Sequence, residues 1–449
     1  MFNAQLKTTC IVLLLAPILV SSCSVQKKIG KSAKSEVLGA APLQTAHVGI
    51  SIYEPAIKKY WYDYQGDKYF VPASNTKIAT CYAAMKYLGD SLVGLRYVSL
   101  SKTDPKDIWI QATGDPTLLH PDFIKQPVVD FLKNDTSVSF GLVTNGQWKD
   151  EAFGSGWSWN DYRASYMSER SSFPIYGNVI RFFGSDNGVS IVPHHIELDY
   201  GGTGNISDGF SYKNKKYNFS RAKDKNLFYW DYSTSDFKYE EIPFITSDGM
   251  TIKFLKDTIK GLQLTTNPNI SLFNPKSILS QPTDSLLKPM MHRSDNFFAE
   301  QSLLMVSNEI LDVMNDEKII DTILKKDFKD LPQKPRWVDG SGLSRYNLFT
   351  PLDIVFILNK MRNEFGMERV KTIFPTGGEG TLTNYYKEDS NYIYAKTGTL
   401  SGVVTISGYL YTKKGKELIF SVLVNNHQAS GTEVRRAVEK FLQEIRNKY

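Results

Sequence analysis

The chain has 449 residues, of which 41% are hydrophobic and 22% are charged, and this ordinary globular composition allows more than one hydrophobic core. Its formal net charge of +6 is small for the length, and no block of arginine and lysine is interleaved with aromatic residues, so we expect no nucleic-acid partner. The many aromatic residues favour β-rich packing or binding grooves.

The first residues have the layout of a secretory signal. Lys7 precedes the apolar run 11–20, which is shorter than the roughly 20 residues that a membrane-spanning helix needs. Small residues and then Cys23 follow, an order that resembles the lipobox of bacterial lipoproteins. We therefore predict removal of residues 1–22 and lipidation of the Cys23 thiol. A plain signal peptide with an incidental cysteine, or a short membrane anchor, is the alternative.

Residues 23–44 are predicted to form a tether, because they are polar, rich in small residues and show little periodicity. The lysines of this segment can either hold it near anionic lipid headgroups or simply be solvated; they are Lys27, Lys28, Lys31 and Lys34. Position 24 is a serine instead of the aspartate that retains many lipoproteins in the inner membrane. We expect a lipid-anchored protein of the bacterial cell envelope that faces the periplasm, with the outer membrane slightly favoured.

Cys81 would be the only thiol of the mature chain, because Cys10 lies in the signal and Cys23 would carry lipid. No intrachain disulfide is then expected. Cys81 shares helical spacing with Ile78 and Tyr82, so we predict a buried, inert thiol.

Strands and helices are predicted at both ends of the fold. The residue pattern predicts strands over 47–53, 69–71, 403–411 and 418–424, and helices over 74–88 and 433–447. Elements of both kinds from both termini predict one sheet built from the two ends of the chain. The section 98–280 between them is strand-rich and dense in glycine, asparagine and aromatics, which is typical of inserted domains.

Ser74 and Lys77 lie three residues apart at the start of a predicted helix. Residues with this spacing share a helix face, so Lys77 can reach the Ser74 hydroxyl. A helix N-terminus also supplies free N–H groups and a positive dipole end, which favour a developing oxyanion. By itself the pair is more typical of an N-cap serine followed by a solvated lysine.

Two further motifs change this interpretation: Ser-Asp-Asn at 294–296 and Lys-Thr-Gly at 396–398. Together with Ser-x-x-Lys they have the order found in penicillin-binding proteins and class A β-lactamases. The gap between Lys77 and Ser294 is too long for a class A β-lactamase. It resembles the D-alanyl-D-alanine carboxypeptidase/endopeptidase group of low-molecular-mass class C penicillin-binding proteins. Further stretches resemble signatures of that family, at 72–74, 113–117, 156–161 and 339–344.

The resemblance implies an α+β fold with a penicillin-binding-protein/serine β-lactamase-like core, in which an antiparallel sheet is flanked by helices, and a large inserted β-rich region. We assign the D,D-peptidase core to residues 45–98 and 281–449. Inserted domain II is assigned to 99–190 and 240–280, and a smaller inserted domain III to 191–239.

The resemblance also implies a serine D,D-peptidase that acts on peptidoglycan stem peptides and their crosslinks. Ser74 would attack the carbonyl of the penultimate D-alanine, and Lys77 would accept its proton if burial and the nearby Lys396 ammonium keep Lys77 neutral. Ser294 would relay a proton to the leaving amine, while Asn296 would hydrogen-bond Lys77 and the substrate amide. β-Lactams would acylate Ser74 and act as covalent inhibitors.

The Lys-Thr-Gly strand would bind the end of the substrate. Lys396, Thr397 and Thr399 would bind the terminal carboxylate, and Gly398 would allow the substrate to approach as an added strand. The backbone N–H groups of Ser74 and Thr399 would form the oxyanion hole.

Family members hold the free end of a diaminopimelate side chain in a side pocket, and four residues match or neighbour its positions. Asp161 and Tyr166 match an aspartate and an aromatic five residues later, and Arg345 and Ser401 are further candidates. Outside the family, Asp161 would be interpreted as a solvated turn carboxylate. Asp339 and the glycines around it are expected to fix a tight loop near the site.

No cofactor or metal site is expected. The pair His194-His195 has no cysteine partner and no His-Glu-x-x-His pattern, so we interpret it as a solvated loop pair. Two other functions stay open: a serine β-lactamase, for which we see no class A deacylating glutamate loop, and a non-catalytic envelope binding lipoprotein. The intact motif residues argue against the second.

Overall fold

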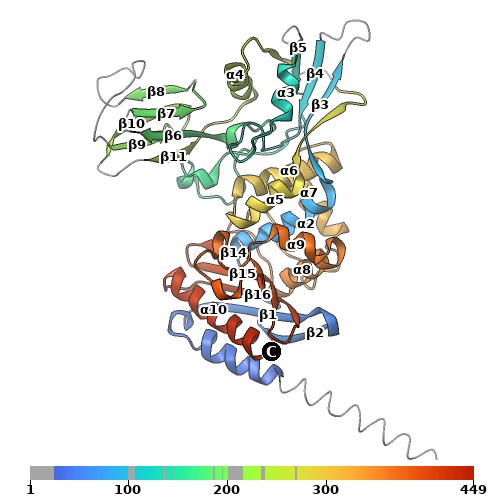
Figure 1. Cartoon of the computed structure of the whole chain (residues 1–449), viewed down its shortest axis with the longest axis vertical. Helices are drawn as coiled ribbons and strands as arrows, with labels where there is room; N and C mark the ends of the chain where they lie inside the picture. The colour runs from blue at the N-terminus through green and yellow to red at the C-terminus, as the bar shows by residue number, and fades with distance from the viewer. Residues whose placement is uncertain are drawn as a thin grey trace, which may run out of the picture.

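The computed structural model describes residues 25–99, 107–134, 138–144, 146–185, 188–194, 196–200, 216–233, 238–267 and 271–449. The predicted signal peptide at 1–22, the predicted lipidation site Cys23 and His195 of the histidine pair lie outside these residues. The chain folds into a lower region built from both of its ends and an upper region built from its middle (Figure 1).

The lower region contains a five-stranded antiparallel sheet in the order β14-β15-β16-β1-β2. Its strands are β1 (His47–Glu54), β2 (Lys59–Tyr64), β14 (Ile393–Leu400), β15 (Val403–Tyr411) and β16 (Glu417–Asn425). β1 pairs with β16 so that His47 lies opposite Asn425. This confirms the prediction of one sheet made from the two ends of the chain.

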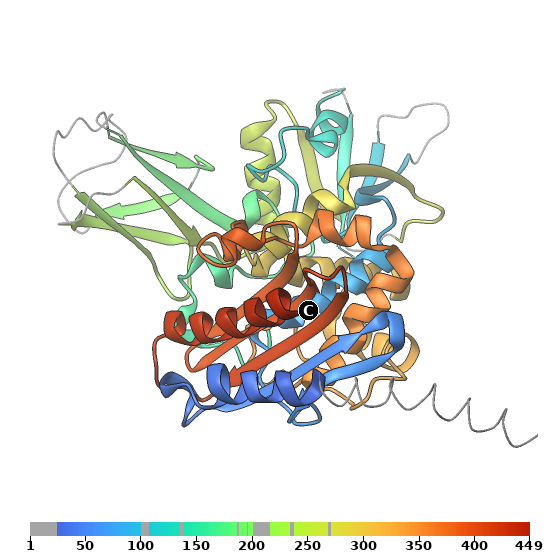
Figure 2. The same cartoon turned by 60° about the horizontal axis from the view of Figure 1, so that its bottom comes forward.

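Helices cover both faces of this sheet. On one face lies α10 (Gly431–Lys448), whose apolar stripe packs on the strands. The other face is covered by a group of helices: α2 (Lys77–Tyr87), α5 (Thr283–His292), α6 (Asn296–Leu311), α7 (Asp316–Lys326), α8 (Pro351–Phe365) and α9 (Met367–Ile373). Figure 2 shows α10 and the N-terminal helical segment lying together across one side of the sheet.

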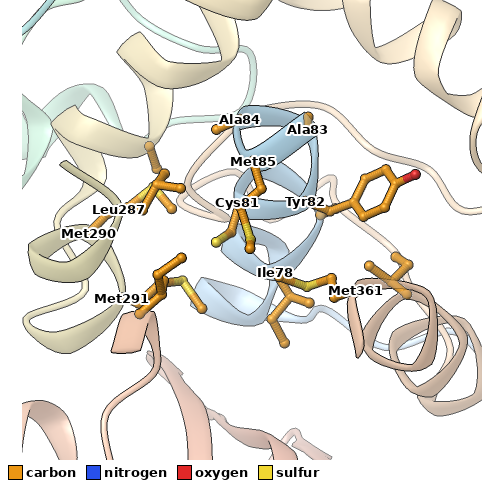
Figure 3. Close-up of a cluster of buried hydrophobic side chains, with 14 of the residues drawn as sticks. Ile78, Cys81, Tyr82, Ala83, Ala84, Met85, Leu287, Met290, Met291 and Met361 are labelled. Atoms are coloured by element: carbon orange, nitrogen blue, oxygen red, sulfur yellow. The ribbon is translucent and has the colours of Figure 1, made fainter. Parts of the chain in front are cut away.

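The helix α2 is buried on nearly every side. Figure 3 shows its residues Ile78 and Cys81 facing methionines of α5 and α8, including Met291 and Met361. Burial raises the pKa of the Cys81 thiol far above its usual value. The prediction of a buried, inert cysteine is confirmed, and α2 gives Ser74 a rigid support.

The N-terminal segment is not a free tether. Residues 25–33 are helical and are followed by two further turns, Lys34–Leu38 and Ala41–Leu43. Ile29, Ala33 and Val37 recur every four residues, are almost fully buried, and pack in the same core as α10. The predicted tether is therefore wrong over 25–43, because three apolar residues among lysines are enough to bury one helix face.

The upper region begins earlier than predicted. Its first sheet has the order β12-β5-β4-β3-β13, and α3 (Pro127–Lys133) and α4 (Asp248–Thr258) contribute to its core. The strands are β3 (Ser91–Ser99), β4 (Asp107–Ala112), β5 (Ser139–Val143), β12 (Gln263–Asn267) and β13 (Lys276–Pro282). Because β3 pairs with β4 and β13, domain II starts near Ser91 and not at residue 99.

Two three-stranded sheets, β8-β10-β9 and β11-β6-β7, form the third unit. Their strands are β6 (Val179–Ser185), β7 (Gly188–Val192), β8 (Glu197–Tyr200), β9 (Lys216–Arg221), β10 (Leu227–Ser233) and β11 (Tyr239–Pro243). β6 pairs with β11 from Val179 to Pro243, so this unit spans more of the chain than the predicted 191–239. None of the helices in the described parts of the chain is long and apolar enough to cross a membrane.

Candidate active site

Ser74 lies in a short 3-10 turn, Ala73–Thr76, that leads directly into α2. The Lys77 ammonium nitrogen is 3.1 Å from Ser74 Oγ and 2.6 Å from Asn296 Oδ1. Lys77 also donates to the backbone carbonyl of Ser341 at 2.8 Å. The predicted contacts of Lys77 with the serine and the asparagine are thus present in the structure.

Burial dominates the electrostatics of Lys77. The side chain has no exposed surface, and removal from water lowers the pKa of Lys77 to about 8, although three acidic groups act in the opposite direction. These groups are Glu300, Asp339 and Asp295. A large fraction of Lys77 is therefore the neutral amine near pH 8, which is the form that accepts a proton.

Lys396 and Ser294 form a second lysine–serine pair. Lys396 Nζ donates to Ser294 Oγ and to the backbone carbonyl of Thr397, each at 2.8 Å. Burial, and then the charge of Lys77, hold the pKa of Lys396 well below its usual range. Ser294 has a φ of +65°, a backbone conformation that costs energy for a residue with a side chain.

β14 is held tightly against the turn that carries the nucleophile. Asn75 Nδ2 donates to the carbonyl of Lys396 at 2.8 Å, and Ser407 Oγ donates to Asn75 Oδ1 at 2.6 Å. A methyl group at Gly398 would lie 2.9 Å from the backbone nitrogen of Ser74, so only glycine fits here.

The open end of β14 carries a cation that sequence reasoning missed. Arg435 of α10 donates to Thr399 Oγ1 at 2.6 Å, and Thr397 Oγ1 donates to Thr381 Oγ1 at 2.7 Å. Arg435 is separated from the Lys-Thr-Gly motif in the sequence, and α10 brings it to the strand. The exposed hydroxyl of Thr399 therefore lies beside a guanidinium.

Asp339 organises a tight loop near the site, as predicted. Its fully buried carboxylate accepts four hydrogen bonds, from Trp157 Nε1, Gly342 N, Ser344 N and Asn347 Nδ2. A methyl group at Gly342, whose φ is +81°, would collide with the carbonyl of Ala73. The loop thus packs on the turn that holds Ser74.

Glu300 of α6 is a buried acid that no sequence motif indicates. Its two oxygens accept the backbone N–H of Ser341 at 2.7 Å and of Gly340 at 3.2 Å. The carbonyl of Ser341 in turn accepts from Lys77, so Glu300 fixes one of the three partners of the lysine. Burial and the nearby Asp339 raise the pKa of Glu300. Its place one helical turn after Asn296 was the signal available in the sequence.

Arg170 connects this network to the inserted domains. Its guanidinium is 2% exposed and lies 2.6 Å from Asp316, 2.8 Å from Asp150 and 3.6 Å from Glu300. One arginine therefore joins three acidic side chains from separate parts of the chain.

Asp161 and Tyr166 lie on two successive 3-10 turns, Trp159–Asp161 and Ser165–Met167. Burial and a hydrogen bond to Asp161 raise the pKa of Tyr166. The backbone carbonyl of Tyr166 accepts from Asn296 Nδ2 at 2.9 Å, which brings this pair beside the Ser-Asp-Asn motif.

The two remaining predicted residues form a second contact. Arg345 Nη2 donates to the carbonyl of Ser401 at 3.0 Å, and both side chains are exposed. Within the described residues, no hydrogen bond or ion pair joins this contact to Asp161 or Tyr166. The structure thus groups these four residues as two separate pairs.

The site and the fold define a class of protein: a serine hydrolase with the penicillin-binding-protein architecture. The match to a known family is direct. The chain belongs to the D-Ala-D-Ala carboxypeptidase 3 (S13) family, whose model matches residues 32–202 and 271–445. The predicted family and the predicted class of enzyme are confirmed.

Two curated relatives carry the name of the same activity. The chain is 23% identical over 441 residues to the D-alanyl-D-alanine carboxypeptidase of Actinomadura sp. (strain R39), a match that covers 87% of this chain and 80% of the relative. It is 28% identical over 185 residues to the D-alanyl-D-alanine carboxypeptidase DacB of Haemophilus influenzae, covering 38% of this chain and 37% of that protein.

A solved structure shows the same fold. The crystal structure of penicillin binding protein 4 (dacB) from Haemophilus influenzae matches with a TM-score of 0.71 at 20% identity, covering 94% of this chain and 98% of that chain. The same protein complexed with a β-lactam matches with a TM-score of 0.67. The predicted fold class is confirmed.

Proposed function

We propose that this enzyme hydrolyses D-alanyl bonds in peptidoglycan stem peptides and crosslinks through an acyl-enzyme on Ser74. The observation that supports this most is the buried Lys77 amine, 3.1 Å from Ser74 Oγ. A nucleophilic serine needs a neighbouring base, and the lowered pKa of Lys77 supplies one near neutral pH.

In the acylation step, Ser74 Oγ attacks the carbonyl carbon of the penultimate D-alanine while its proton passes to neutral Lys77. The tetrahedral intermediate collapses, the C–N bond breaks, and the leaving amine receives a proton from Ser294. Lys396, which donates to Ser294 Oγ, keeps this hydroxyl oriented and restores its proton. Water then attacks the ester carbonyl, and one of its protons passes through Ser294 back to Lys396. The ester C–O bond breaks as the Lys77 ammonium returns its proton to Ser74 Oγ, which releases the acid and free Ser74.

The edge position of β14 supports binding of the substrate as an added strand. Ala395 N donates to the carbonyl of Pro375 on the free side of β14. Because backbone N–H groups alternate along a strand, those of Thr397 and Thr399 point to the same side, which opens toward Ser74. The N–H of Thr399 and that of Ser74 would stabilise the oxyanion.

The end of the substrate would meet polar groups around β14. The hydroxyls of Thr397 and Thr399 and the ammonium of Lys396 would bind the terminal carboxylate. Arg435, which donates to Thr399 Oγ1, places a positive charge at this end of the strand.

The diaminopimelate side chain would extend toward Asp161 and Tyr166. The carboxylate of Asp161 suits its free ammonium group, and Arg345, held on the carbonyl of Ser401, suits its carboxylate. The hydrogen bond from Asn296 to the Tyr166 carbonyl supports this arrangement, because it ties the pocket to the catalytic asparagine.

β-Lactams would acylate Ser74, and the resulting acyl-enzyme would be hydrolysed slowly. In the described part of the chain, Lys77 is the hydrogen-bond partner of Ser74 Oγ, and no carboxylate forms a hydrogen bond with it. A deacylating carboxylate is what a β-lactamase would need. With a chromogenic cephalosporin we expect a single stoichiometric burst; rapid repeated turnover would instead favour the β-lactamase alternative.

We further propose that Cys23 carries lipid and that the enzyme faces the periplasm, with the outer membrane slightly favoured. The support is the sequence order of basic, apolar and small residues before Cys23. Metabolic labelling with a palmitate analogue should mark the wild-type chain and leave Cys23→Ser unlabelled.

The decisive test of the activity is mass spectrometry of muropeptides treated with the wild-type protein or with Ser74→Ala. We expect loss of one D-alanine from pentapeptides and conversion of crosslinked dimers to monomers, both absent in the variant. Equal product formation by the two proteins would show that the proposed nucleophile is wrong.

A further inference from the structure

Lysines from three separate segments lie around one end of the five-stranded sheet. The N-terminal helical segment contributes Lys27, Lys28 and Lys31, the turn after β1 contributes Lys58 and Lys59, and the turn between β15 and β16 contributes Lys413 and Lys414. All seven are exposed, and we call them the basic end.

Contacts between the three segments place these lysines together. Gln26 Nε2 donates to the carbonyl of Tyr60 on β2 at 3.2 Å, which fixes the start of the N-terminal helix beside that strand. Lys416, in the β15–β16 turn, pairs with Glu54 at the end of β1 at 2.9 Å. The backbone N–H of Lys414 donates to the carbonyl of Tyr449 at 2.8 Å, so the last residue of α10's segment lies beside this turn.

The charge of the basic end is not neutralised by the protein. Three other lysines in this region are paired, namely Lys416 with Glu54, Lys440 with Glu36 and Lys448 with Glu444. None of the seven lysines of the basic end forms an ion pair with a residue that the structure describes. Such a surface attracts anions over roughly 10 Å at moderate salt.

An exposed apolar side chain lies within the same surface. Ile57, in the short turn Pro55–Ile57, is 52% exposed and is followed directly by Lys58 and Lys59. A side chain of this kind flanked by lysines suits the boundary between lipid headgroups and acyl chains.

We propose that the basic end is a membrane-docking surface that binds anionic lipid headgroups and holds the catalytic cleft turned away from the bilayer. The proposal rests on the proposed anchoring of the chain at Cys23. Two residues lead from Cys23 to Val25 at the start of the helical segment, and they can span at most about 7 Å. The anchor and the basic end therefore meet the membrane together.

The order of strands in the sheet also relates the basic end to the proposed active site. β2 and β14 are the opposite edges of the five-stranded sheet, which places them about 19 Å apart at the usual strand spacing. Lys58 and Lys59 lie where β1 turns into β2, Lys413 and Lys414 lie in the turn between β15 and β16, and Lys396 lies on β14, the edge strand opposite β2. Docking would thus present the cleft, and the inserted domains above it, to the cell wall.

The test uses the processed chain, residues 23–449, with Cys23→Ser so that no lipid contributes. Sedimentation with vesicles of phosphatidylglycerol and phosphatidylethanolamine is compared with sedimentation with phosphatidylcholine vesicles. We expect binding to the anionic vesicles that falls steeply with added salt, and much weaker binding to the neutral ones.

A matched pair of variants locates the surface. Replacing Lys28, Lys59 and Lys414 by glutamine should weaken binding about a hundredfold at low salt, since each lysine near an anionic membrane contributes about fivefold. The control replaces Lys253, Lys256 and Lys260 by glutamine, three exposed lysines of domain II, and should bind within about twofold of the parent.

Equal binding to anionic and neutral vesicles would overturn the proposal, as would an equal loss of vesicle binding in both triple variants. The proposal would also be wrong if the Lys28, Lys59 and Lys414 variant lost binding to purified sacculi but kept its binding to vesicles. Acylation by a fluorescent penicillin, measured on each variant, should stay at the parent rate because these lysines lie far from Ser74. Palmitate labelling of the wild-type chain tests the anchor at Cys23 separately. A failure of anchoring can therefore be told apart from a failure of docking.

Discussion

At the scale of single residues, the proposed mechanism depends on the protonation state of one amine, that of Lys77. Lys77 has a pKa of about 8, lowered by burial from the ordinary 10.5 of a lysine, and its nitrogen contacts the nucleophile. Below pH 8 the group is mostly ammonium and cannot accept the proton of Ser74; above pH 8 it is mostly the free amine. The free amine of Lys77 is therefore available about two and a half pH units below the pH at which an exposed lysine loses its proton.

We expect the rate of acylation by a fluorescent penicillin to rise about tenfold per pH unit up to about pH 8 and to level off above it. The measurement is the second-order rate constant between pH 6 and 10. A rate that keeps rising to pH 10 would mean that Lys77 has an ordinary pKa, and a flat profile would mean that another group accepts the proton.

Glu300 is expected to act as a positioning residue for Lys77. In Glu300→Gln one carboxylate oxygen becomes an NH₂ group that faces a backbone donor, so the loop loses one of two buried hydrogen bonds at Gly340 or Ser341. Losing such a bond costs about 1–3 kcal/mol, and we expect acylation to slow about tenfold or more. The pH at which the rate levels off should also fall, because the negative charge of Glu300 raises the pKa of Lys77.

The control for this variant is Glu309→Gln on the same helix, where the acid pairs with Arg96 of β3 at 2.6 Å. It should leave both the acylation rate and its pH profile unchanged. A purely structural role for Glu300 would lower the melting temperature without moving the pH profile.

At the scale of elements, the essential contact is the one between β14 and the turn before α2. A methyl group at Gly398 would lie 2.3 Å from Thr405 Oγ1 and 2.9 Å from the nitrogen of Ser74. Strand and turn would have to separate, which would widen the space in which the substrate carbonyl must fit. The space at this contact accommodates the hydrogen of Gly398 but not a methyl group.

Gly398→Ala is therefore predicted to reduce acylation at least a hundredfold and to destabilise the core by about 1–3 kcal/mol. Penicillin acylation and thermal unfolding measure the two effects. Gly249→Ala is the matched control, because Gly249 lies in the first turn of α4 with its nearest neighbour atom at 3.8 Å. Its activity should equal that of the parent, and similar losses in both variants would contradict the steric argument.

The sequence predicted the elements that carry strong local signals. The apolar residues of α2, the β-branched runs of β15 and β16 and the amphipathic face of α10 are each strong local signals. The three motifs contain side chains that the structure brings together. β2 was missed, since its sequence KYWYDY has one buried residue and lies at a sheet edge.

Other features could not be predicted because they depend on tertiary contacts. The carbonyl of Ser341 has no side-chain signature, and Arg435 reaches Thr399 because α10 packs beside β14 and β15. The tether was predicted from polar and small residues with little periodicity, whereas the three apolar residues of the same segment determine its fold. The start of domain II was misplaced because the partners of β3 follow in distant segments.

At the scale of the whole molecule, Arg170 links the inserted domains to the catalytic core. It lies in the segment between β5 and β6, and its partners Asp316 and Glu300 belong to α7 and α6 of the core. Trp157 packs beside its guanidinium at 5.7 Å and donates to Asp339. The Asp339 loop and the segment between β5 and β6 thus meet at one buried cluster of charges.

Arg170→Met should leave the carboxylates of this cluster buried without their cation, at a cost of about 3–5 kcal/mol. We expect a lower melting temperature together with slower acylation, because Glu300 would lose its partner. The control is Arg369→Met, which breaks the partly exposed pair with Asp284 and should cost less than about 1 kcal/mol. Equal losses of stability in the two variants would show that the buried ion pairs of Arg170 contribute no more than the partly exposed pair of Arg369.

The sheet that joins the two ends of the chain has a consequence for when activity can begin. β1 finds its partner β16 only at the far end of the sequence, where His47 pairs with Asn425. During synthesis and export, Ser74 emerges long before Lys396, and the turn that holds it has no strand to rest on. Under the proposed function, a chain that still lacks β14 to β16 would therefore hold Ser74 without Lys396 and without the strands that support it. Completion of the sheet would then be the step that assembles the proposed site.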